Sequence, residues 1–151
     1  MDYREFRRLR EGCISNLPPA SAAVLDAAAS QLRRRLEASA MFAGVTVETS
    51  SDPERLLVAL VHYRPGAPTA QVSSHLEAVW VTELRLPGLD AYNFHTDGGH
   101  VELESFTGDK SSGYFLTLHL VAEEGTAEEF AKSTAQTPDT AERTTRRWFR
   151  R

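Results

Sequence analysis

The chain has 151 residues, of which 41% are hydrophobic and 25% are charged, and this composition predicts one globular domain with its own core. Its single cysteine, Cys13, excludes an internal disulfide framework and a zinc site built on two or more thiolates. The longest unbroken apolar run, Leu56 to Val61, is far too short to cross a bilayer. The charged N-terminal residues lack the pattern of a signal peptide, so we expect a cytoplasmic domain without a transmembrane segment.

Charge is distributed unevenly along the chain. Residues 1–35 carry seven arginines against four acidic residues, whereas residues 36–142 carry five basic residues against seventeen acidic ones. The last nine residues, 143–151, carry five arginines and no acid. An acidic body repels nucleic-acid phosphates, so nucleic-acid binding is disfavoured for the body and left open only for the C-terminal tail.

The N-terminal third predicts two helices. Asp2 and Glu5 form a capping-box pattern that predicts a short first helix ending at Gly12. After a rigid linker, Leu17-Pro18-Pro19, apolar residues at helical spacing predict a second helix over about 20–40.

Beyond residue 40 the apolar period changes from 3.6 to 2, which predicts strands. The run 56–63 is apolar on both faces until His62 and predicts a central, fully buried strand. A helix with the apolar face Val72, Leu76, Val79, Trp80 and Leu84 is expected over 68–84. Further strands are expected at 45–49, 91–96, 100–106 and 114–122, and a capping box at Thr126 and Glu129 predicts a short last helix.

Strands joined by hairpins outnumber any strand–helix–strand units in this order. The simplest packing is an α+β fold with two layers, an antiparallel sheet of about five strands and helices packed on one face. We expect a single domain over 1–133, with N-terminal helices in 2–40, the sheet and its helix in 45–122 and a short helix in 127–133. Residues 134–151 are expected to form a polar linker and a basic aromatic tail.

The strands around Asp97-Gly98-Gly99 carry the first candidate site. An Asp-Gly or Gly-Gly pair between alternating runs is typical of a two-residue hairpin. Because side chains alternate with period 2, the hairpin collects polar residues on one face: Asn93, His95, Asp97, His100, Glu102 and Glu104. On the last strand, His119 alternates with apolar residues and can join the same polar side.

Two interpretations of this polar face remain open. Imidazole and carboxylate groups suit a divalent transition metal, with metal-ligand candidates His95, Asp97, His100 and His119, or general acid–base catalysis, with candidates His95, Asp97, His100 and Glu102. The alternative is the ordinary solvated face of a half-covered sheet, where cross-strand His–acid pairs are common. No metal-ligand spacing signature is present, so we expect no cofactor, the alternative being a divalent transition metal.

The C-terminal tail is the second candidate site. It combines cationic and aromatic side chains that suit contact with an acidic surface, namely Arg143, Arg146, Arg147, Trp148, Phe149 and Arg150. The acidic middle of the chain makes a protein surface, its own or that of a second copy, the expected partner. Folding of the aromatic residues back onto the domain is the alternative.

Two classes of function follow from these observations. The first is a non-enzymatic protein-binding or assembly module, of chaperone, immunity or structural-subunit type, that uses an acidic sheet face and the basic aromatic tail. The second is a small metal-dependent or His-based hydrolase centred on the 95–102 hairpin. We favour binding and self-association, because catalysis needs a convergent pocket that sequence alone does not show.

Overall fold

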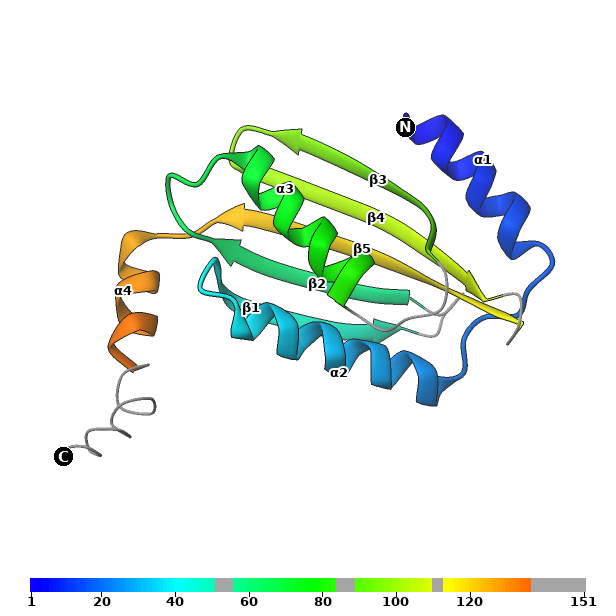
Figure 1. The fold of residues 1–151 in the computed structure, drawn as a ribbon, viewed down its shortest axis with the longest axis horizontal. Coiled ribbons are helices and arrows are strands. Elements are labelled where there is room, and N and C mark those ends of the chain that lie inside the picture. Colours follow the sequence, from blue (N-terminus) through cyan, green and yellow to red (C-terminus); the bar gives the residue numbers. More distant parts are fainter. Residues whose placement is uncertain (51–55, 84–88, 110–112, 137–151) are drawn as a thin grey trace.

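A computed structural model describes residues 1–50, 56–83, 89–109 and 113–136. Its elements are four α-helices, one π-helical segment and one five-stranded sheet (Figure 1). The sheet order is β1-β2-β5-β4-β3. The strands are β1 (Phe42–Ser50), β2 (Leu56–Tyr63), β3 (Leu89–Asp97), β4 (His100–Asp109) and β5 (Tyr114–Glu124). The α+β class with an antiparallel-rich sheet is therefore confirmed.

One strand pair departs from the expected antiparallel sheet. β2 pairs with β5 in parallel, with Leu56 opposite Thr117 and Tyr63 opposite Glu124. The other three pairs are antiparallel. β5 thus lies between the β1–β2 hairpin and the β3–β4 hairpin, and this long-range insertion leaves no local signal in the sequence.

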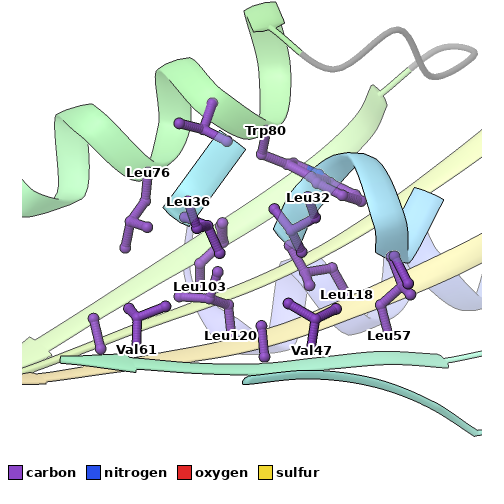
Figure 2. Close-up of a cluster of buried hydrophobic side chains, with 14 of the residues drawn as sticks. Leu32, Leu36, Val47, Leu57, Val61, Leu76, Trp80, Leu103, Leu118 and Leu120 are labelled. Atoms are coloured by element: carbon purple, nitrogen blue, oxygen red, sulfur yellow. The ribbon is translucent and has the colours of Figure 1, made fainter. Parts of the chain in front are cut away.

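Two helices cover one face of the sheet and bury the core. These are α2 (Ala22–Ala38) and α3 (Thr69–Glu77), the latter continued by the π-helical segment Ala78–Glu83, and both lie across the same side in Figure 1. Leucines of α2 and Trp80 of the π-helical segment meet the inward residues of the strands (Figure 2), among them Val47, Leu57, Val61, Leu103, Leu118 and Leu120. Val72, Leu76, Val79 and Trp80 are buried as predicted, whereas Leu84 lies outside the described residues.

The first helix, α1 (Tyr3–Ile14), packs on the opposite face of the sheet, which we call the outer face. Its Phe6 contacts Phe106 of β4 at a ring-centroid distance of 5.7 Å, in a small cluster with Ala91. Phe106 alternates with Ser105, whose hydroxyl accepts a hydrogen bond from the core residue Trp80, so Phe106 points away from the core. The expectation that the helices pack on one face of the sheet therefore holds for α2 and α3 but not for α1.

The linker after α1 explains how consecutive helices reach opposite faces. It pairs with the start of β5, where the Phe115 amide donates to the Pro18 carbonyl at 2.9 Å and the Ala20 amide donates to the Phe115 carbonyl at 2.7 Å. This edge contact carries the chain around the end of the sheet. The last helix, α4 (Ala127–Gln136), stands at the end of the sheet opposite α1 (Figure 1).

Element boundaries follow the local capping chemistry. Asp2 accepts a hydrogen bond from the Glu5 amide at 2.8 Å, as the capping box predicted, but α1 continues through Gly12 to Ile14. Gly12 does not adopt a positive φ, so it does not end the helix as a left-handed cap would. Thr126 caps α4 by accepting from the Glu129 amide at 3.1 Å.

The prediction of a fully buried β2 was wrong for one of its faces. Leu57, Ala59, Val61 and Tyr63 are buried, but Val58 and Leu60 on the outer face remain 38% and 39% exposed. The physical reason is that α2 and α3 cover only the core face. Among the described residues, none of the helices has the length and hydropathy needed to cross a bilayer.

Candidate functional site

The outer face of the sheet is ordered in cross-strand rows. The strand register places Val58 of β2, His119 of β5 and Glu104 of β4 side by side in one row. The next row holds Leu60, Val121 and Glu102. An apolar strip along β2 therefore lies beside an imidazole–carboxylate strip on β5 and β4.

The shared polar face of the hairpin is confirmed, and the structure decides its register, which the sequence left open between an Asp97-Gly98 and a Gly98-Gly99 turn. Asn93 lies opposite Glu104, His95 opposite Glu102 and Asp97 opposite His100, so these polar residues share the outer face as the period-2 pattern indicated. The two turn residues are Gly98 and Gly99, and Gly98 adopts a φ of +54°, a conformation that glycine reaches without steric cost.

Three polar side chains converge at the centre of the outer face. The His119 Nε2 atom lies 2.9 Å from the Glu102 Oε2 atom, and its Nδ1 atom lies 3.5 Å from the Glu104 Oε2 atom. One ligand atom from each residue falls within 4.8 Å of the other two. These side chains are 37%, 27% and 21% exposed for His119, Glu102 and Glu104, so they form a half-buried cluster.

The carboxyl group of Glu104 has a pKa above its ordinary value. Burial raises its pKa, and the nearby carboxylate of Glu102 raises it further, while His119 and the arginines of α1 oppose the rise. A carboxylate that has lost part of its hydration and faces a like charge favours a positive partner. In this structure His119 occupies that position.

The remaining predicted residues are not part of this group of three, although Asn93 and His95 lie on β3 opposite Glu104 and Glu102 and line a shallow hollow with them. His95 and Asp97 are exposed toward the hairpin tip, and the His100 Nδ1 atom lies 3.9 Å from the Glu123 Oε2 atom. Within the described ranges, the group of three possible metal ligands is Glu102, Glu104 and His119. It includes the predicted candidates Glu102 and His119 and adds Glu104, while His95, Asp97 and His100 are not part of it.

A groove runs between α1 and the sheet beside this cluster. Its volume is about 460 Å³. The helix contributes Tyr3, Phe6, Arg7 and Arg10, and the sheet contributes Leu56, Val58, Glu104, Thr117, Leu118 and His119. The groove therefore combines aliphatic side chains of the sheet, two aromatic rings and two guanidinium groups of α1, and the Glu104 and His119 members of the cluster.

A second imidazole–carboxylate pair, which the sequence analysis missed, joins α4 to the sheet. The His62 Nδ1 atom lies 2.8 Å from a Glu129 carboxylate oxygen. Beside it, the guanidinium of Arg64 stacks over the Phe130 ring at 5.0 Å. The two residues are 67 positions apart, so only the tertiary structure reveals the contact.

The tail residues predicted to bind a partner lie outside the described residues, namely Arg143, Arg146, Arg147, Trp148, Phe149 and Arg150.

Comparison with known proteins gives no further assignment, because neither a scan against protein-family models nor a search of curated proteins finds a match for this chain.

Proposed function

We propose that this chain is a non-enzymatic protein-binding or assembly module whose outer sheet face receives a basic aromatic peptide segment. The observation that carries the proposal is the exposed apolar strip of β2 beside the carboxylates of β4. Val58 and Leu60 are each more than a third exposed, whereas the equivalent positions on the core face are buried. Exposed aliphatic side chains gathered on one face are typical of a contact surface.

The charge of this face specifies the chemistry of the partner. Glu102 and Glu104 lie one strand beyond the apolar strip, across β5, Glu123 lies on the same face of β5, and Glu48 of β1 lies opposite Val58. A partner that combines arginines with aromatic rings would pair with the carboxylates and bury its rings on the aliphatic residues.

The chain itself supplies a segment of this chemistry. Residues 143–151 carry five arginines and the adjacent Trp148 and Phe149. α4 ends at Gln136, and the fifteen residues that follow reach about 50 Å when extended. The length and charge of this segment suit the acidic outer face of its own chain or of a second copy, and we propose the second copy as the form of binding.

Sedimentation velocity tests this proposal by comparing the full chain with a chain that ends at residue 142. We expect the full chain to show a mass that increases with protein concentration, and the shortened chain to remain monomeric. The shortened chain keeps every element described above. An unchanged mass distribution, together with unchanged capture of partner protein, would remove the tail from the proposal.

A metal-dependent hydrolase is the second candidate function. The observation that favours it is the clustering of Glu102, Glu104 and His119, the last two of which line a groove. The candidate centre then lies on β4 and β5 instead of at the hairpin tip. Hydrolysis by a metal-bound water needs a bound ion with an open coordination position, so metal binding is its first requirement.

A further inference from the structure

The cluster of Glu102, Glu104 and His119 has the donor set of a transition-metal site. The structure fixes its geometry through paired strands. Glu104 lies directly opposite His119, and Glu102 precedes Glu104 by two residues on the same face of β4. Sites built on neighbouring strands hold their donors more firmly than sites on loops. One imidazole nitrogen and two carboxylate oxygens are donors that zinc and related divalent ions accept.

The donor separations suit a single ion after small side-chain rotations. Donors around a tetrahedral zinc ion lie about 3.3 Å apart, given metal–ligand bonds of roughly 2.0–2.1 Å. The His119 Nε2 and Glu102 Oε2 atoms are already 2.9 Å apart, and one donor atom from each of the three residues lies within 4.8 Å of the others. Glu102 and Glu104 contact different ring nitrogens of His119, so a shared ion requires one of the carboxylates to rotate toward the nitrogen that the other one contacts.

The surroundings of the cluster favour a cation between the two carboxylates. The groove that Glu104 and His119 line is also lined by Val58 of β2 and by Tyr3 and Phe6 of α1. This packing removes water from Glu104, while Glu102 adds a like charge. Arg7 and Arg10 line the same groove and oppose a bare cation, but Arg7 is itself paired with Glu11 at 3.1 Å.

We propose that Glu102, Glu104 and His119 form a three-ligand site for a zinc-like divalent transition metal ion, with its remaining coordination position open to the groove beneath α1. The two carboxylates bind through oxygen, and the imidazole binds through one ring nitrogen. The ion takes the place of any proton on that nitrogen, and the proton leaves to solvent. This inference deepens the hydrolase candidate, whose centre it is, and it uses the two carboxylates, Glu102 and Glu104, that the peptide proposal pairs with arginines, so zinc binding is measured separately from self-association.

Equilibrium dialysis of the full chain against micromolar Zn²⁺ tests the site at about pH 7.5, where an ordinary imidazole is neutral. We expect one zinc ion per chain. His119→Gln and Glu102→Gln should each weaken zinc binding at least about tenfold, because each removes a direct ligand. Circular dichroism of each variant verifies that the fold is retained.

Two matched variants separate this site from its neighbours. His95→Gln removes an exposed imidazole opposite Glu102, and Glu123→Gln removes an exposed carboxylate of β5. Both should bind zinc as the unmodified chain does. The proposal is overturned if the folded full chain binds no stoichiometric zinc, if His119→Gln binds zinc unchanged, or if His95→Gln loses binding to the same extent as His119→Gln.

Discussion

The buried indole of Trp80 shows how a single polar contact is accommodated in the core. Its Nε1–H donates to the Ser105 hydroxyl at 2.6 Å, and that hydroxyl donates to the Ala91 carbonyl at 3.3 Å. Ser105 is completely buried, so no water can replace its oxygen. This small relay links the π-helical segment to β4 and β3.

Replacing Ser105 with alanine should lower the free energy of unfolding by about 1–3 kcal/mol, since the indole N–H then lacks an acceptor. Urea unfolding measures the loss. In a Trp80→Phe background the same Ser105→Ala substitution should have a clearly smaller effect, because phenylalanine has no N–H to satisfy. Additive effects of the two substitutions would contradict the proposed hydrogen bond.

Glu104 gives a pH prediction with a definite sign. Its pKa is raised in the folded state above the ordinary value of 4.5, so the folded protein holds this proton more tightly than the unfolded chain does. The ionised carboxyl therefore destabilises the fold above its folded-state pKa. This penalty declines as pH falls toward 4.5 and is absent below that value.

Glu104→Gln should accordingly raise the free energy of unfolding at neutral pH in metal-free buffer, and the gain should disappear at acidic pH. Denaturant melts across this range measure the difference from the unmodified chain. Glu123→Gln, on the exposed part of the same face, is the control and should change stability by less than about 0.5 kcal/mol. The prediction is contradicted if Glu104→Gln has a lower free energy of unfolding than the unmodified chain at neutral pH and this difference disappears at acidic pH.

At this scale the sequence predicted which residues share a face but not which ones touch. Strict alternation placed His95 and Glu102 on one face of the hairpin and allowed His119 to join that face, because period 2 is a local property of a strand. The contact of Glu104 with His119 depends on β5 lying beside β4 in one register. The His62–Glu129 pair depends on the docking of α4, for which no local pattern exists.

Among the elements, α1 is the one whose packing most affects the candidate site. It contacts the outer face through the buried ring of Phe6, which meets Phe106 and Ala91. The rest of the helix is largely exposed. α1, which lines one side of the groove, is therefore held on the sheet mainly by the apolar contact of Phe6.

Phe6→Ala should destabilise the protein by about 3 kcal/mol, as expected for removal of a buried aromatic ring. Hydrogen exchange should show the amides of α1 losing protection while those of α2 keep theirs, because the two helices pack on different faces. Leu9→Ala, an exposed position on the same helix, is the control, with a change of at most about 0.5 kcal/mol. Equal loss of protection in both helices would show that α1 is not an independent element.

The existence and type of the elements were largely predictable, and their extents were less so. Capping boxes at Asp2 and Thr126 located two helix starts, and the glycine pair located the hairpin turn. β1 begins at Phe42 instead of Val45, and β4 continues to Asp109. Strands extend wherever a neighbour offers backbone partners, and those partners are set by the tertiary fold.

At the scale of the whole molecule, the sheet order and the placement of α1 could not be predicted. Both depend on contacts between distant parts of the chain: the parallel β2–β5 pairing and the passage of the Pro18-Pro19 linker along the start of β5. These contacts leave one face of the sheet covered by α2 and α3 and the other largely open. The open face is what gives the chain its candidate binding surface.

The most direct test of the central claim is a fluorescence-anisotropy titration of a labelled peptide with the sequence of residues 143–151 into the chain that ends at residue 142. The account predicts saturable binding that Val58→Lys weakens at least about tenfold, because the substitution adds a positive charge to the apolar strip. Val81→Lys, at an equally exposed valine of the π-helical segment, should leave binding unchanged. Absence of saturable binding, or equal loss in both variants, would contradict the assignment of the outer face as the binding surface.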